Sequence, residues 1–340
     1  MPYAHLNGIR LYYEEEGSGP PLLLLEGLGY ALWMWFRQRP VLRQHFRLVL
    51  PDTRGVGLSD IPPGPYTIDL FAADALALLD HLGIPRAHVL GVSMGGMVAQ
   101  ALALRSPDRV ERLVLVSTTP GGPAAAPMPL QTAEALLAAR TLPPREGLRA
   151  AMALAFSDGY MAAHPAEVEQ ILDWRLERLQ PPEAWMWQLQ AGQAFDVSAR
   201  LHEIRHPTLV VAGSADRVLP VANAYLLASR LPHAALRIFA GAGHLVFIEQ
   251  ADAFNRLVVA FLRGGPVADS AGTGAGAGGG TRSPPTPATS CATGRFASAW
   301  RACRWRSWGW TTRAPAGTIW PVRWPPGGTR GARSRPCGCS

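Results

Sequence analysis

The sequence predicts an α/β protein with a mostly parallel, doubly wound sheet and an inserted helical lid. Short apolar runs alternate with longer helical patterns through most of residues 1–263, as expected where helices cover both faces of a sheet. A serine flanked by glycines separates one apolar run from the helical pattern that follows it. Residues 121–204 interrupt the alternation before it resumes.

The expected strands are short and rich in Val, Leu and Ile, and the expected helices have one apolar face. Strands are expected near residues 9–13, 22–25, 47–50, 87–91, 112–116, 208–212 and 236–239, and helices near 67–83, 95–105, 220–231 and 250–263. The interrupting segment predicts four amphipathic helices, Leu130–Arg140, Arg145–Phe156, Ala166–Leu179 and Pro182–Phe195. The predicted domains are a core (1–120 and 205–263), a helical lid (121–204) and a tail (264–340).

Residues 91–95, Gly-Val-Ser-Met-Gly, lie between an expected strand and an expected helix. A serine at the apex of such a turn has a strained backbone, and the glycines two residues before and after it relieve the crowding. Its hydroxyl projects clear of the backbone, and the helix N-terminus behind it favours negative charge. We expect Ser93 to be a nucleophile; the alternative is an ordinary tight turn.

A serine nucleophile needs a base and a group that orients the base, and two later strands end in such residues. Asp216 follows the apolar run 208–213, and His244 lies in a glycine-rich loop after 236–239. Open α/β sheets build their sites beyond the carboxyl ends of strands, which predicts that all three side chains share one edge. His244 is the candidate general base, and Asp216 is the candidate that holds its tautomer. Taken alone, Asp216 is also typical of a turn.

The order serine, aspartate, histidine resembles that of the α/β-hydrolase-fold serine hydrolases, and the resemblance extends over residues 1–263. Residues 22–29 resemble the strand and loop that supply one oxyanion-hole amide, and residues 52–60 resemble the family's D-x-R-G-x-G-x-S loop. Two further matches are the acid loop at 213–220 and the histidine loop at 243–255. The resemblance implies that the backbone N–H groups of Leu28 and Met94 form the oxyanion hole.

One position departs from the family pattern, because many relatives have His-Gly where this chain has Glu26-Gly27. A different side chain does not remove an oxyanion hole made of backbone N–H groups. Since buried charges need partners, we expect Glu26 to point to the back of the loop and tether it. The alternative places a carboxylate beside a site that stabilises negative charge.

Within that family the chain looks most like small carboxylesterases and 3-oxoadipate enol-lactonase-like hydrolases. This resemblance implies cleavage of a small carboxylic ester or lactone through an acyl-enzyme on Ser93, without cofactor or metal. The alternatives are 3-oxoadipate enol-lactonase-type activity and a cofactor-free haloperoxidase or perhydrolase activity, which the same triad supports through a peracid. The non-enzyme alternative is a triad-bearing binding module. Epoxide hydrolases and dehalogenases have an aspartate where Ser93 stands.

Aromatic residues of the lid and of the loop after residue 29 are candidates for the substrate pocket. We expect substrate contacts from Trp33, Trp35 and Trp187; the alternative is that each only packs the lid on the core. An anionic lactone would also need a cation. Because the chain has no lysine, lid arginines such as Arg140 and Arg175 are the candidates.

The formal net charge of +7 is unevenly distributed. Residues 1–263 hold 22 arginines and 24 acidic residues, so this nearly neutral body is not expected to bind nucleic acid. No apolar run approaches the roughly 18 residues of a membrane span, and no signal-peptide pattern begins the chain. We therefore expect a cytoplasmic protein without a membrane partner. The oligomeric state stays open.

The tail, residues 264–340, has ten arginines, one acidic residue, all four cysteines and six of the eleven tryptophans. One hypothesis is binding of nucleic acid or anionic lipid through arginines and aromatic rings. A second is metal binding, although the close pair Cys337 and Cys339 lacks zinc-site spacing. We favour the third, a disordered or unselected sequence such as an out-of-frame translation, because this composition cannot bury a core.

Overall fold

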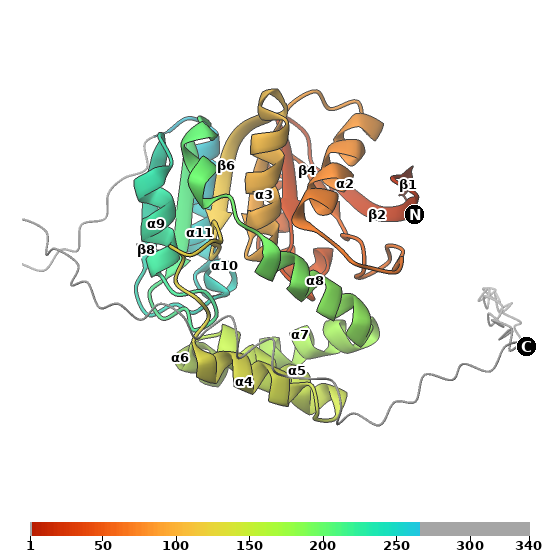
Figure 1. Cartoon of the computed structure of the whole chain (residues 1–340), viewed down its shortest axis with the longest axis vertical. Helices are drawn as coiled ribbons and strands as arrows, with labels where there is room; N and C mark the ends of the chain where they lie inside the picture. The colour runs from red at the N-terminus through yellow and green to blue at the C-terminus, as the bar shows by residue number, and fades with distance from the viewer. Residues whose placement is uncertain (1, 266–340) are drawn as a thin grey trace, which may run out of the picture. The chain divides into compact units, whose positions relative to one another are not determined.

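Eight strands form one sheet in the computed structural model, which describes residues 2–265 (Figure 1). Their order across the sheet is β1-β2-β4-β3-β5-β6-β7-β8. Strands β1 and β4 run antiparallel to β2, and the other neighbouring pairs are parallel. The strands are β1 Tyr3–Leu6, β2 Ile9–Glu16, β3 Pro21–Leu25, β4 Arg47–Pro51, β5 Ala87–Val92, β6 Val110–Val116, β7 Thr208–Gly213 and β8 Ala234–Phe239. The predicted fold class is thereby confirmed.

Helices follow most of the parallel strands, and a separate group of helices lies between β6 and β7. The helices are α1 Arg39–Leu42, α2 Ile68–His81, α3 Met94–Arg105, α4 Leu130–Ala139, α5 Pro144–Ala155, α6 Asp158–Ala163, α7 Pro165–Glu177, α8 Pro182–Ala194, α9 Ala222–Arg230, α10 Val246–Glu249 and α11 Ala251–Leu262. Short 3-10 turns cover Leu32–Trp35, Pro107–Arg109 and Ser198–Glu203. Among residues 2–265, no helix has both the length and the hydrophobicity needed to span a membrane.

Helices cover both faces of the sheet. Because successive side chains of a strand point to opposite faces, each strand contributes to two separate hydrophobic clusters. Along β3, Leu23 and Leu25 belong to one hydrophobic cluster, and Leu22 and Leu24 belong to the other. The helices α2, α3 and α9 contribute to the first cluster, and α11 contributes to the second.

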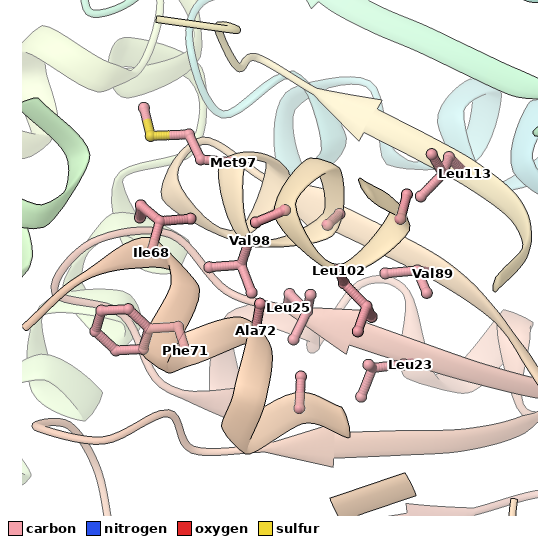
Figure 2. Close-up of a cluster of buried hydrophobic side chains, with 14 of the residues drawn as sticks. Leu23, Leu25, Ile68, Phe71, Ala72, Val89, Met97, Val98, Leu102 and Leu113 are labelled. Carbon is pink, nitrogen blue, oxygen red and sulfur yellow. The ribbon is translucent and has the colours of Figure 1, made fainter. Parts of the chain in front are cut away.

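Figure 2 shows the first cluster where α2 and α3 cover the sheet. Phe71 of α2 lies among side chains that include Leu25 of β3 and Val98 of α3, and each of the three is nearly or fully buried. At about 25 cal/mol per Å² of apolar area removed from water, this layer is a main source of stability. It also fixes α3, and hence the turn that precedes α3, against the sheet.

Strand β1 is the one strand that the sequence pattern missed, because four residues are too few to show a clear alternation. It forms a hairpin with β2 through Asn7 and Gly8, whose φ angles are 47° and 76°. Positive φ at both central residues is the geometry that an Asn-Gly pair favours in a two-residue hairpin. The Asn-Gly pair is therefore the signal from which this hairpin could have been predicted.

The segment between β6 and β7 contains α4 to α8, drawn in yellow and green in Figure 1. Four of these helices, α4, α5, α7 and α8, correspond to the four predicted ones with ends that differ by at most two residues. The extra helix, α6, has six residues and begins after Ser157, whose side chain accepts a hydrogen bond from the Tyr160 N–H. We use the word lid for residues 121–204. The predicted tail lies outside the described residues except for residues 264 and 265.

Candidate active site

Ser93 occupies a sharp turn between β5 and α3 and is partly exposed. Its φ and ψ angles are 54° and −116°, a conformation that non-glycine residues rarely adopt. Such strained backbone conformations are concentrated at functional sites. The flanking glycines are required by close packing. A Cβ at Gly91 would lie 2.2 Å from the Gly95 carbonyl oxygen, and one at Gly95 would lie 2.1 Å from the Leu25 carbonyl oxygen.

His244 and Asp216 form a buried pair. The distance between His244 Nδ1 and Asp216 Oδ2 is 2.8 Å, and the Asp216 side chain has no exposed surface. Its other oxygen, Oδ1, accepts hydrogen bonds of 2.8 Å from the N–H groups of Val218 and Leu219. A carboxylate held in this way fixes both the ring orientation and the tautomer in which Nδ1 carries the proton, which leaves Nε2 as an acceptor.

The three predicted residues follow strands that lie close together in the sheet. Ser93 follows β5, Asp216 follows β7 and His244 follows β8, and β5 to β8 are consecutive and parallel. The last two loops are joined by a 2.9 Å hydrogen bond from the Ala215 N–H to the Ala242 carbonyl. Within residues 2–265 the structure pairs His244 with Asp216 but has no hydrogen bond between Ser93 and His244. Such bonds are often long without substrate.

The loop after β3 lies beside Ser93. Leu25 pairs with Gly91 in the parallel β3–β5 ladder, so Gly27 comes level with Ser93. A Cβ added to Gly27 would lie 3.5 Å from the Ser93 Cβ. The N–H groups of the two predicted oxyanion donors, Leu28 and Met94, donate to no acceptor among the described residues. Both N–H groups are therefore available to a ligand.

Glu26 is completely buried, and its Oε1 accepts a 2.6 Å hydrogen bond from the Thr53 N–H. It tethers the loop after β3 to the loop after β4, as expected from the sequence. Burial, and then the charge of Asp52, raises the pKa of Glu26 to about 8. At neutral pH the neutral carboxylic acid therefore predominates, and Glu26 places no full negative charge at the start of the loop after β3.

The loop at residues 52–60 matches a family pattern, but that pattern does not reveal what its side chains do. Asp52 Oδ1 accepts from the Leu32 N–H at 2.8 Å, and Oδ2 accepts from the Leu58 N–H at 2.7 Å. Burial raises the pKa of Asp52 to about 6. Arg54 forms a buried two-point ion pair with Asp74 of α2, with distances of 2.5 Å and 2.7 Å. These contacts hold the loops around the site on the core.

The three predicted substrate contacts lie in different environments. Trp35 has no exposed surface and packs on Phe247 with ring centroids 5.5 Å apart, so it is a core residue and the expectation of substrate contact is corrected. Its place on a short 3-10 turn directs its ring inward, which spacing alone does not reveal. Trp33 is partly exposed, and its ring centroid lies 5.7 Å from that of Trp174 of α7. Trp187 of α8 packs on Tyr66 at 5.3 Å.

Two lid arginines lie over aromatic rings next to the loop after β3. The Arg140 guanidinium carbon is 4.2 Å from the centroid of the Trp185 ring, and that of Arg175 is 4.6 Å from the Tyr30 ring. Partial burial, and after it the charge of Arg175, lowers the pKa of Arg140. Neither arginine forms an ion pair within residues 2–265. In the same part of the chain, no group of three or more His, Cys, Asp or Glu residues is arranged to hold a metal ion.

A serine on a strained strand-to-helix turn, with a buried His–Asp pair after later strands of a mostly parallel sheet, is typical of α/β-fold hydrolases. The chain belongs to the alpha/beta hydrolase fold family, whose model matches residues 20–251. It is therefore a hydrolase.

Known relatives differ in what they act on. The chain is 32% identical over 252 residues to 3-oxoadipate enol-lactonase 2 of Acinetobacter baylyi, which covers 73% of this chain and 90% of that protein. It is 33% identical over 272 residues to 2-hydroxy-6-oxo-6-phenylhexa-2,4-dienoate hydrolase of Comamonas testosteroni. This match covers 76% of this chain and 93% of that protein. The crystal structure of the enol-lactonase from Burkholderia xenovorans LB400 superposes with a TM-score of 0.70 at 34% identity, covering 77% of this chain and all of that one.

Proposed function

We propose that this protein is a serine hydrolase that cleaves a small carboxylic ester or lactone through an acyl-enzyme on Ser93. The observation that carries the proposal is the pairing of His244 Nδ1 with the buried Asp216 carboxylate, at the edge where Ser93 has φ 54°. A serine hydroxyl needs an oriented base to attack a carbonyl carbon, and this pair supplies one.

In the proposed reaction, Ser93 Oγ attacks the carbonyl carbon while His244 Nε2 takes the hydroxyl proton. Asp216 stabilises the resulting imidazolium. The carbonyl oxygen becomes an oxyanion that accepts hydrogen bonds from the N–H groups of Leu28 and Met94, at the N-terminus of α3. The intermediate collapses, His244 donates its proton to the leaving alkoxide, and the acyl group stays on Ser93. Water then repeats the sequence and releases the acid.

A second candidate is hydrolysis of an anionic enol-lactone, and the lid arginines favour it. Arg140 and Arg175 come from different parts of the lid, and the rings beneath them belong to Trp185 and Tyr30. A Cβ at Gly29 would lie 3.2 Å from the Trp185 ring, so these cations lie near the loop after β3 (the oxyanion loop, residues 26–31), which contains the proposed oxyanion donor Leu28. A substrate carboxylate would give an arginine the bidentate partner that it lacks within the described residues. Enol-lactonases among the relatives support the same substrate class.

Fluorophosphonate labelling and a panel of p-nitrophenyl esters and simple lactones test the proposal. Wild-type protein should be labelled once, and Ser93→Ala should lose both labelling and ester turnover. Ser229→Ala, at an exposed serine of α9, is the matched control and should behave as wild type. Wild-type rates in Ser93→Ala, or a wild-type protein that is never labelled, would show that the proposal is wrong and favour a binding module.

A further inference from the structure

Gln188 is a fully buried amide on the lid helix α8. Its Oε1 accepts a hydrogen bond from the Gly29 N–H at 3.1 Å, and its Nε2 donates to the Arg54 carbonyl oxygen at 3.2 Å. One partner is a backbone donor and the other a backbone acceptor, so only one orientation of the amide satisfies both. The side chain thus joins the lid to two separate loops of the core.

The position of Gly29 gives this contact its meaning. Gly29 directly follows Leu28, whose N–H is a proposed oxyanion donor, and it has a φ of 75° that few other residues adopt. A glycine in this conformation has little intrinsic preference to hold it, so external contacts set the loop. Two contacts come from α8: the amide of Gln188 and the ring of Trp185, which lies 3.2 Å from where a Gly29 Cβ would be.

A buried amide is costly unless its polar atoms are paired, and an apolar side chain of similar size fills the same space without that cost. Packing alone therefore does not explain a glutamine at this position. The hydrogen bond to Gly29 does, because it removes the rotational freedom of the peptide group that follows Leu28. Gln188 is 159 residues away from Gly29 in the chain, so the contact is purely tertiary.

We propose that Gln188 is a positioning residue: through it the lid holds the oxyanion loop in the geometry that stabilises the transition state. The lid then contributes to catalysis in addition to covering the site. This inference rests on the proposed function, because it needs the Leu28 N–H to bind an oxyanion formed by attack of Ser93.

The expected signature is a loss in kcat with little change in KM. Oxyanion contacts strengthen as charge develops, so a displaced donor weakens the transition state more than the bound substrate. For Gln188→Leu we expect kcat for a p-nitrophenyl ester to fall about tenfold or more, with KM changed less than about threefold. Inhibition by a trifluoromethyl ketone, which mimics the tetrahedral intermediate, should weaken by a factor similar to the loss in kcat.

Two matched variants separate this role from general lid packing. Asn223→Leu removes another buried amide that joins the lid to the core, because Asn223 Oδ1 accepts from the Ala126 N–H and Nδ2 donates to the Ala126 carbonyl, both at 2.9 Å, but it takes no acceptor from Gly29. Gln190→Leu makes the same change at an exposed position of α8. Both should retain near wild-type kcat. Gln188→Glu keeps an acceptor for Gly29, and its protonated form also keeps a donor for Arg54. Its kcat relative to wild type should therefore rise as the pH falls, whereas that of Gln188→Leu should stay flat.

The outcomes distinguish this inference from the proposed function. Active-site titration with a fluorophosphonate corrects each kcat for the folded fraction, so loss of folding is not mistaken for loss of catalysis. If Ser93→Ala is inactive but Gln188→Leu keeps the wild-type kcat, the inference fails and the proposed function stands. Equal losses in the Gln188→Leu and Asn223→Leu variants would also overturn it, and an active Ser93→Ala variant would remove the basis of both. If Gln188→Leu fails to fold, the test is the kcat of Gln188→Glu divided by that of wild type. A ratio that does not change with pH overturns the inference.

Discussion

Glu249 binds Ser157 through both its carboxylate oxygens and so joins the histidine loop to the lid. Oε1 accepts from the Ser157 N–H at 2.9 Å, and Oε2 accepts from the Ser157 hydroxyl at 2.7 Å. The same Oε1 accepts from the N–H of Gly243, the residue before His244, at 3.0 Å. A single carboxylate at the end of α10 therefore fixes the proposed general base relative to the start of α6.

Replacing Glu249 tests this link. Glu249→Ala leaves the N–H groups of Ser157 and Gly243 without their acceptor, which should cost about 2 kcal/mol of unfolding free energy and lower kcat. Glu249→Gln keeps an acceptor for both N–H groups and should lie between Glu249→Ala and wild type. Urea unfolding and ester kinetics measure the two effects. Equal stability of wild type and Glu249→Ala would contradict the role given to this residue.

The proposed triad predicts strongly non-additive losses. Ser93→Ala and His244→Ala should each abolish ester turnover to a similar extent, because the two residues act as a unit. Asp216→Asn should lower kcat less than either but still by about 10²- to 10⁴-fold, since an amide favours the wrong imidazole tautomer. Single-turnover assays of acyl-enzyme formation measure each step. A double variant Ser93→Ala/His244→Ala far less active than either single variant would argue against a shared mechanism.

The raised pKa of Glu26 predicts a pH-dependent stability. From its ordinary pKa of 4.5 up to about 8, the folded protein keeps a proton that the unfolded chain releases. The free energy of unfolding contributed by Glu26 is therefore fully present below about pH 4.5 and declines as the pH rises through this range. Glu26→Gln keeps an acceptor for the Thr53 N–H and has no proton to lose.

Denaturant unfolding across this pH range checks the sign. The stability of Glu26→Gln relative to wild type should increase steadily with pH. Glu134→Gln, at an exposed position of α4, is the control and should show a constant difference from wild type. A Glu26→Gln variant whose relative stability decreases with pH would mean that Glu26 is ionised in the folded protein.

The buried Arg54–Asp74 pair predicts an asymmetric stability loss. Asp74→Ala leaves the Arg54 guanidinium buried without a counter-charge, which should cost about 3–5 kcal/mol of unfolding free energy. The double variant Arg54→Met/Asp74→Leu removes both charges and should be much more stable than Asp74→Ala. Thermal unfolding of the single and double variants measures the difference. A double variant less stable than Asp74→Ala would contradict this account.

The lid arginines predict the choice of substrate. If the anionic lactone is the substrate, Arg140→Gln or Arg175→Gln should lower kcat/KM for it by about tenfold or more and leave neutral esters nearly unchanged. Arg145→Gln is the control, because Arg145 is a lid arginine already paired with Glu169 and Asp173. Rates that rise with acyl length from acetate to butyrate, with no turnover of the lactone, would favour a general esterase.

The sequence alone predicted those parts of the site that depend on local chemistry. The turn at Ser93 could be recognised because two glycines, a strand and a helix lie within a few residues of it, and close packing leaves room for nothing larger. Asp216 and His244 each follow a short apolar strand, and parallel strands bring such loops to one edge. The seven predicted strands have the same origin in local apolar runs.

Contacts between distant segments were decided only by the tertiary structure. Gln188 carries no local signal, because its partners Gly29 and Arg54 lie far away in the chain. The histidine loop contains Glu249, but its bonds to Ser157, 92 residues away, could not be predicted from that loop. Trp35 and Trp187 look alike in the sequence, yet one lies in the core and the other contacts Tyr66 from the lid. Local patterns specify the backbone geometry and which loops lie at the carboxyl ends of the strands. Which buried polar groups of the lid and of these loops pair with one another depends on how the lid packs, and no single segment contains that information.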